Sequence, residues 1–135
     1  MNRLLRLLPW VMTLGLLTSA CGGDACEVGS EQHRTELFFG LDRQNAEPVS
    51  EQEWQNFVDT VVSPRFGAGL TMFDADGQYL MDDGTLIHEN SKVIILLHDG
   101  SSTPSRDIDA IREEYKQRFS QEAVLRIGDV SCVAF

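Results

Sequence analysis

The chain has 135 residues, of which 21 are acidic and 11 are lysine or arginine, for a formal net charge of −10 at pH 7. This acidic balance argues against nucleic acid and anionic lipid surfaces as partners. The length suits one domain with a hydrophobic core of its own.

The first 20 residues have the layout of an export signal. Arg3 and Arg6 precede an uncharged run at residues 7–17, and three small residues follow at 18–20. The apolar run is too short for a membrane-spanning helix, which needs about 20 residues. We therefore expect residues 1–20 to be removed, which takes away two basic residues and leaves the chain more acidic.

Cys21 follows a stretch that resembles a lipobox, in which the cysteine after the cleavage site receives a diacylglyceryl group. Ser19 and Ala20 fit that pattern, whereas Thr18 stands where Leu is most frequent. We expect a lipid on Cys21, and secretion with a free thiol is the alternative. Gly22 is not the Asp that resembles an inner-membrane retention signal, so the periplasmic side of the outer membrane is favoured. The lipid would be the only membrane contact.

The chain has three cysteines, and an odd number leaves one thiol unpaired in an oxidising compartment. A lipid on Cys21 removes this problem and leaves Cys26 and Cys132 as a disulfide pair. Closing a loop of about 100 residues is worth up to ~4.7 kcal/mol in the chain-entropy model. The alternative is that both thiols stay free.

Residues 21–34 lack apolar periodicity, and we expect the lipidated cysteine and a flexible tether there, followed by a single domain at residues 35–135. The domain begins with a predicted strand at residues 35–41. A helix is predicted at residues 51–62, because Ser50 and Glu53 form a capping box and Val49 can pack on Trp54 across the first turn. Pro64 disfavours continuation of this helix.

The second half of the domain is predicted to contain three more strands and a helix. A strand at residues 70–73 is followed by a turn at 74–77, and residues 78–81 continue or return it. The apolar run at residues 93–97 predicts a buried central strand within 86–97. A helix begins near Thr103 and places Ile108, Ile111, Tyr115 and Phe119 on one face. The last strand covers residues 123–127 and 130–135, with a break at Gly128.

The predicted order is β-α-β-β-α-β, an α+β ferredoxin-like fold with two helices on one face of a four-stranded antiparallel sheet. This topology brings Cys26 and Cys132 toward the same edge. The sheet has two apolar faces, because Phe38 alternates with Leu37 and Phe39, and residues 93–97 are all apolar. A homo-oligomer packed through the open face would cover the second one. Alternatively, the tether or the hairpin at residues 74–84 folds over it.

From Leu37 to Phe135 the chain resembles a bacterial family known as domain of unknown function 3574. The resemblance is carried by Trp54, Phe57, residues 64–66 and 69–71, Gly77, Gln78, Glu89, Lys92, Tyr115, Phe119 and Gln121. The chain departs from the family pattern at Gly67, where Pro is usual, and at Tyr79, where Trp is usual. The resemblance implies an envelope protein of unknown activity and no particular chemistry.

Four residues are weak candidates for chemistry. Arg65 stands in a glycine-bearing loop where it could receive an anion, although an internal ion pair, for example with Glu89, is favoured. His98 ends the apolar strand beside Asp99, but neighbouring strand residues point to opposite faces. An enzyme acting on a small molecule would use some of Arg65, Tyr79, Glu89 and His98.

A metal site is not predicted. The four aspartates at positions 74, 76, 82 and 83 are better explained as turn residues, because the glycine spacing does not match a calcium loop. His88 and Glu89 lack the second histidine of a metalloprotease motif. We therefore expect no cofactor, and a binding or self-associating envelope module is favoured over the enzyme.

Overall fold

The computed structural model describes residues 26–43 and 45–135. The predicted signal and Cys21 lie outside the described residues. The elements in chain order are β1 (Ser30–Gly40), α1 (Glu51–Phe57), the π-helix η1 (Val58–Val62), β2 (Thr71–Leu80), β3 (Leu86–His98), α2 (Ser102–Phe119) and β4 (Leu125–Val133). This order confirms the predicted α+β ferredoxin-like fold.

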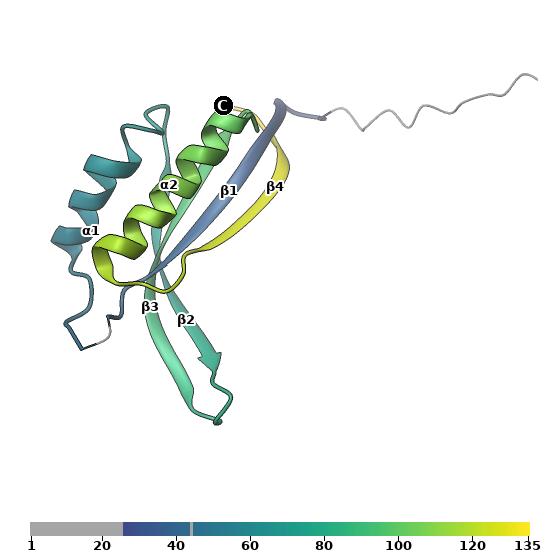
Figure 1. The fold of residues 1–135 in the computed structure, drawn as a ribbon. Helices are drawn as coiled ribbons and strands as arrows, with labels where there is room; N and C mark the ends of the chain where they lie inside the picture. The colour runs from purple at the N-terminus through teal and green to yellow at the C-terminus, as the bar shows by residue number, and fades with distance from the viewer. Residues whose placement is uncertain (1–25, 44) are drawn as a thin grey trace, which may run out of the picture.

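The four strands form one antiparallel sheet in the order β2-β3-β1-β4, and both helices lie on the same face of it (Figure 1). Between the helices and the sheet lies a core of aromatic rings. Phe39 from β1 packs edge-on against Trp54 and Tyr115, with ring centroids 5.2 and 4.8 Å apart. These rings come from three different elements, so the aromatic cluster holds the two layers together. Within the described ranges, no helix is long and apolar enough to cross a bilayer.

The predicted capping box begins α1. The backbone N–H of Glu53 donates to the Ser50 hydroxyl, and the Glu53 carboxylate accepts from the Ser50 N–H at 2.9 Å. The helix does not stay α-helical to residue 62 as predicted. From Val58 onward it is a π-helix, and the Ser63 N–H donates to the Val58 carbonyl five residues earlier. The Thr60 hydroxyl donates to the Asn56 carbonyl, which competes with regular α-helical bonding there.

The start of the fold lies earlier than predicted. β1 begins at Ser30, opposite Val133 of β4, so residues 30–34 belong to the sheet and not to a tether. Upstream of β1, Cys26 forms the predicted disulfide with Cys132, with their Cα atoms 5.5 Å apart. Residues 26–29 are therefore also tied to the domain, because the crosslink holds them against β4.

Two predicted interruptions of strands are absent. β2 is continuous through residues 74–77, because each of these residues pairs with a residue of β3 and Lys92 forms an ion pair with Asp74 at 2.6 Å. β4 is continuous through Gly128, which pairs with Thr35. In both places strand pairing overrides the local turn preference of Asp and Gly.

The β2–β3 hairpin extends beyond the rest of the sheet. β1 ends at Gly40, opposite Ser91, and the Leu41 N–H still donates to the Asn90 carbonyl at 2.9 Å. Beyond that bond, residues 77–80 and 86–89 pair only with each other. Figure 1 shows this hairpin arm, residues 76–90, projecting past the end of β1. The arm continues the sheet, so the alternative in which the hairpin folds over the open sheet face is wrong.

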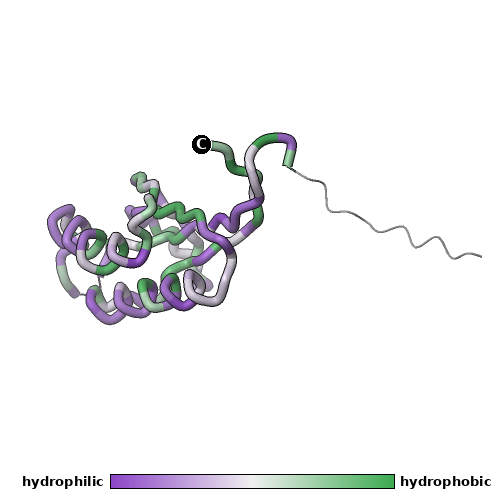
Figure 2. Tube along the Cα trace, turned by 90° about the horizontal axis from the view of Figure 1, so that it is seen from above, coloured by the Kyte–Doolittle hydropathy of each residue, from purple (hydrophilic) through white to green (hydrophobic). Residues whose placement is uncertain are grey.

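The sheet has the two apolar faces that the sequence predicts. Leu37, Phe39, Ile94 and Leu96 belong to the core under the helices. Their strand neighbours point to the opposite side. We call this side the open face, and its central residues are Phe38, Val93, Ile95 and Leu97. Seen from above in Figure 2, the hydrophobic colour runs along the strands, while the helices carry much of the hydrophilic colour.

Candidate functional site

A cavity of about 420 Å³ lies at the base of the hairpin arm, where the arm meets the ends of β1 and α2. Three of its residues belong to the arm, and the others follow β1 or α2. They are Tyr79, Ile87, Glu89, Asp42, Arg43 and residues 120–123. The volume lies within the range of small-molecule sites, which is roughly 300–1,000 Å³.

Glu89 lies on β3 two residues before Ser91, the first residue of β3 that pairs with β1. Its carboxylate lies over Gly40, so that a Cβ atom at position 40 would come within 2.2 Å of Oε1. Burial raises the pKa of Glu89, and the nearby Asp42 carboxylate raises it further, while the Asp42 backbone N–H opposes the shift by stabilising the ionised form. Glu89 therefore keeps its proton to a higher pH than an exposed glutamate does.

Tyr79 supplies an aromatic ring to the same cavity. It pairs with Ile87 across the hairpin arm, on the same side of the arm as Glu89. The ring is 54% exposed. Both residues were predicted candidates, and the structure brings these two together.

The loops that close the cavity are fixed by hydrogen bonds. The Gln121 side-chain amide donates to the Asp42 carbonyl, and the Tyr115 hydroxyl donates to the Gly40 carbonyl at 2.9 Å. Ser120 adopts a left-handed conformation that ends α2 and turns the chain toward β4. The segments after β1 and α2 are thus attached to each other, which gives the cavity a firm wall.

Arg43 brings a positive charge to the cavity, but this charge is already paired. Its guanidinium contacts the Glu53 carboxylate at 2.6 Å and stacks over the Phe119 ring at 5.5 Å. Hydrogen bonds from Arg43 and Ser50 lower the pKa of Glu53 to about 2. With Arg43 paired in this way, the carboxylates of Asp42 and Glu89 give the cavity an acidic character.

A second cavity of about 450 Å³ shares Asp42 and Glu89 with the first. It adds Asp76, His88 and Asn90 of the arm to the lining. Glu89 and Asp42 therefore form a partition between two recesses on either side of the arm, and both recesses are acidic.

Arg65 does not join this site. Its Nη1 atom donates to the Val61 carbonyl at 2.6 Å, so the predicted ion pair with Glu89 is wrong. Arg65 follows η1 and precedes β2, whose first residue, Thr71, pairs with Ile95. Along β2 the position of Tyr79 is roughly 26 Å from Thr71, at about 3.3 Å per residue. Arg65 and Tyr79 thus lie at opposite ends of the sheet.

His98 is also far from Glu89. Both residues are on β3, separated by roughly 30 Å of extended strand. The Gly100 N–H donates to Nδ1 of His98 at 3.1 Å, so Nε2 carries the proton and donates to the Thr35 hydroxyl at 3.0 Å. Burial and the nearby His33 lower the pKa of His98. We interpret His98 as a structural residue that ends β3.

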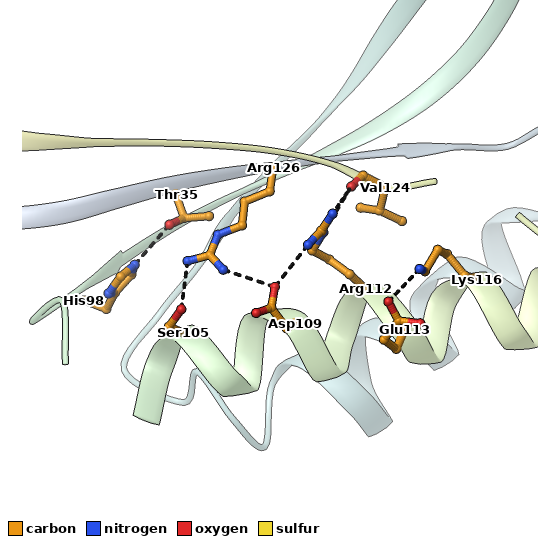
Figure 3. Close-up of polar contacts among 9 residues, drawn as sticks. All are labelled: Thr35, His98, Ser105, Asp109, Arg112, Glu113, Lys116, Val124 and Arg126. Carbon is orange, nitrogen blue, oxygen red and sulfur yellow. Dashed lines mark hydrogen bonds and ion pairs between the residues drawn. The ribbon is translucent and has the colours of Figure 1, made fainter. Parts of the chain in front are cut away.

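The remaining polar groups on the helical side are structural as well. In Figure 3, Arg126 of β4 reaches down to Asp109 and Ser105 of α2, and Arg112 of α2 reaches up to the Val124 carbonyl. The two arginines share Asp109, and each closes part of the gap between helix and edge strand. This network attaches α2 to β4.

Among the described residues, no group of three metal-ligating side chains comes together. Asp74, one of the four aspartates noted in the sequence, instead forms an ion pair with Lys92, which also binds Glu51 at 2.6 Å. The site at the base of the arm has two carboxylates and an aromatic ring, a combination suited to organic ligands.

Sequence reasoning missed Asp42 and Gln121 as part of the site. Both follow elements that end at the same side of a ferredoxin-like fold as the β2–β3 hairpin. The topology could have indicated this grouping, because the loop after β1 and the loop before β4 must both lie next to that hairpin. Their residue types alone give no signal.

Comparison with known proteins supports the fold and gives the family. A phage SAM lyase in complex with S-methyl-5'-thioadenosine is similar over 76% of this chain and 90% of its own, with 19% identity and a TM-score of 0.54. A phage SAM lyase in its apo state is 20% identical over 78% of this chain and 92% of its own, with a TM-score of 0.53. The periplasmic divalent cation tolerance protein CutA from Archaeoglobus fulgidus is 10% identical over 71% of this chain and 81% of its own, with a TM-score of 0.46.

No curated protein matches the sequence closely enough to indicate a relative. The model of the family described as protein of unknown function DUF3574 matches residues 34–135, which is nearly all of the described domain. The chain therefore belongs to the DUF3574 family.

Proposed function

We propose that this domain binds a small organic cation in the cavity at the base of the hairpin arm, on a protein anchored in the cell envelope by a lipid on Cys21. The observation that carries the ligand class is Glu89, a partly buried carboxylate with a raised pKa at the wall of a ligand-sized cavity. Each part of the proposal has its own support.

The charge of the cavity favours a cation. The Asp42 carboxylate lies close enough to Glu89 for its negative charge to raise the pKa of Glu89. A bound positive charge opposes this effect, because it stabilises the ionised carboxylate. The Arg43 guanidinium cannot do this equally well, since it is engaged by Glu53.

The exposed Tyr79 ring adds a second feature that organic cations use. A cation within about 6 Å of an aromatic face gains roughly 0.5–2 kcal/mol, and a flat ligand group can stack on the same ring. Carboxylate and ring together favour an amine or sulfonium that carries a planar group over a bare metal ion.

This chemistry makes S-adenosylmethionine a suitable first probe. The molecule combines a sulfonium cation with a flat adenine ring, and the similar phage protein is described as a SAM lyase. The structural likeness concerns the fold alone, so the choice of probe rests on the charge and ring of the cavity.

A specific observation also favours a second candidate, an enzyme acting on such a cation. A glutamate whose pKa is raised in a cleft is a better general base than an exposed glutamate. Incubation of the protein with S-adenosylmethionine, followed by mass spectrometry of the small molecules, would distinguish turnover from binding. Conversion that is lost in Glu89→Gln would favour the enzyme, and intact S-adenosylmethionine in a complex would favour the binding module.

Binding is tested by calorimetric titration of a protein that starts at residue 21 and carries Cys21→Ser. S-Adenosylmethionine is the cationic probe, and adenosine is the neutral one. We expect binding of the cation that is weakened roughly tenfold or more in Glu89→Gln, because a charge-assisted contact is worth about 1.5–3 kcal/mol. Tyr79→Leu should weaken it less.

Glu113→Gln is the matched control, because it removes the same charge from the exposed surface of α2, where Glu113 pairs only with Lys116. Equal affinity of the Glu89→Gln and parent proteins would contradict the proposed site. Equal affinity for adenosine and the cation would contradict the ligand class.

The envelope location is supported by the sequence before the domain and by the disulfide, because disulfides persist in oxidising compartments. The test is fractionation of cells that express the full chain. We expect the protein in the membrane fraction and the Cys21→Ser variant in the periplasm. A parent protein without an acyl group on Cys21 by mass spectrometry would contradict the anchor.

A further inference from the structure

The open face of the sheet carries two rows of side chains that run across all four strands, and six of their eight members are large and apolar. Paired residues on neighbouring strands point to the same side. The first row consists of Phe73, Val93, Phe38 and Leu125, one from each strand. The second row, two residues further along, consists of Thr71, Ile95, Glu36 and Ile127. Together they place six large apolar side chains on the side away from the helices.

The outer members of these rows are accessible. Phe73, Leu125 and Ile127 are 46%, 56% and 47% exposed. Val93, at the centre, is fully buried although it lies outside the core cluster under the helices. Its neighbours on the open face therefore bury it, which means that an apolar layer exists on this side without a partner among the described residues.

The face has the size of the apolar centre of a protein interface, not of a whole one. Four strands about 4.8 Å apart and β3 from Ser91 to Leu97 give a flat footprint of roughly 19 by 20 Å, or roughly 400 Å². Side-chain relief and the adjoining side of the arm increase the accessible area beyond this footprint. A standard interface buries about 800 Å² per partner, whereas scattered apolar residues on a monomer need no partner.

Within residues 26–43 and 45–135, no segment covers the rows of the open face. The hairpin arm extends away from the face. Phe135 reaches only the end near Ile95 and Leu97, where these residues share the lining of a cavity of about 400 Å³. Residues 21–25 read Cys-Gly-Gly-Asp-Ala and contain no large apolar side chain that could cover the rows.

The charges on the face indicate what the occupant is. Arg34 lies between Glu36, with which it forms an ion pair, and Asp129 on β4 at 3.7 Å. The face thus carries both signs next to its apolar rows, while the chain as a whole is strongly acidic. Acidic membranes would be repelled by this chain. A copy packed about a two-fold axis beside Arg34 would bring its own Arg34 toward Glu36 or Asp129, and this arrangement of charges suits a second copy of the chain.

We infer that the open face is an interface between two copies of this chain, packed sheet against sheet through the rows of Phe38 and Ile95. The inference does not depend on the proposed cation site, because the cavity lies beyond the end of β1 and the apolar rows lie beside it. It names a second copy as the occupant, with the helices of both copies facing outward.

The test is sedimentation equilibrium of the protein that starts at residue 21 and carries Cys21→Ser. We expect twice the chain mass at concentrations near 10 µM, and a dissociation constant at least roughly tenfold weaker in Ile127→Glu, because a buried unpaired carboxylate opposes sheet packing. Gln117→Glu on α2 adds the same charge on the helical side, where its side chain is exposed, and should sediment as the parent does.

A parent protein that remains monomeric at ~100 µM would overturn the inference, as would an Ile127→Glu variant that assembles like the parent. Circular dichroism establishes that the variants are folded. If Ile127→Glu does not fold, Leu125→Glu replaces it, since that side chain is more exposed and its substitution disturbs the sheet less. A parent that is monomeric alone but binds another envelope protein also overturns the inference.

Discussion

The two edges of the sheet are built in opposite ways. At the β4 edge the strand is tied to β1 by its full pairing, to the upstream segment by the Cys26–Cys132 disulfide, and to α2 by Arg112 and Arg126. At the other edge the outer half of the β2–β3 hairpin has only its own strand pairing. The proposed site lies where the hairpin arm meets the segments that follow β1 and α2.

The β4 edge contributes mainly to stability, and the hairpin arm carries residues of the proposed site. Local opening is easiest where buried contacts are few, and binding residues are often found in such regions. Glu89 and Tyr79 belong to the arm, but the carbonyls of Gly40 and Asp42 are held by side chains of Tyr115 and Gln121. The arm, which few contacts hold, and a wall fixed by hydrogen bonds thus form one cavity.

Loss of the disulfide should have the largest effect. Cys26 and Cys132 are 106 residues apart, and removal of such a crosslink costs about 2–5 kcal/mol of unfolding free energy. We expect this loss in urea denaturation of Cys21→Ser/Cys132→Ser relative to Cys21→Ser alone. Cation affinity in the folded variant should be unchanged, because the crosslink lies at the opposite end of β1. Equal stability of the two proteins would show that the edge does not depend on the crosslink.

A methyl group at position 40 should disturb the site and the fold together. In Gly40→Ala the new Cβ atom would collide with the Glu89 carboxylate, and the displaced side chain should cost about 1–3 kcal/mol of stability. Cation affinity should fall roughly tenfold. Gly67→Ala is the matched control, because its Cβ atom would meet only the Ser63 carbonyl oxygen at 3.6 Å. A Gly40→Ala protein with unchanged affinity would mean that the position of Glu89 is unimportant.

Cation binding should depend on pH through Glu89. Its raised pKa means that the carboxylate is lost at a higher pH than the ordinary value of 4.5 as the solution is acidified. Affinity should therefore decrease on acidification within the window above 4.5, and Glu89→Gln should remove that part of the profile. A profile that stays flat down to pH 4.5 would contradict the role of this carboxylate.

The smallest effect should come from His98 at the opposite end of β3. Its pKa is lowered in the fold, so the unfolded chain binds a proton first as the pH falls below 6.5. The stability it contributes is present above 6.5 and is lost as the pH falls toward the lowered value. Denaturation series in this range should show a shallower pH dependence for His98→Asn than for the parent, while cation binding at pH 7 stays the same. A steeper dependence in the variant would contradict this sign.

The fold was largely predictable because its signals are local and mutually consistent. The capping box of Ser50 and Glu53, the apolar run at residues 93–97 and the cysteines at the two ends of the domain each indicate one structure. The turn predicted at residues 74–77 failed because the pairing of Asp74 with Lys92 is a tertiary contact that local preferences do not contain. The early start of β1 was missed for the same reason, since β4 determines it.

The site was only partly predictable. Tyr79 and Glu89 were identified as residue types capable of chemistry, but Arg65 and His98 were grouped with them without knowledge of the register. Register decides that Glu89 lies opposite Gly77 in the arm while His98 lies opposite His33 at the far end. The end of β1 was predicted to within one residue, but burial of Glu89 beside Asp42 also depends on the register of β3 against β1, which the sequence does not state.

The central claim is that a partly buried carboxylate at the base of the arm binds an organic cation. The most direct test is a titration of the parent and Glu89→Gln proteins side by side at pH 7 with the same cationic probe, with Glu113→Gln as the charge control. We expect the parent and the control to bind alike, and Glu89→Gln to bind roughly tenfold more weakly or not at all. Equal affinity in all three proteins would contradict it.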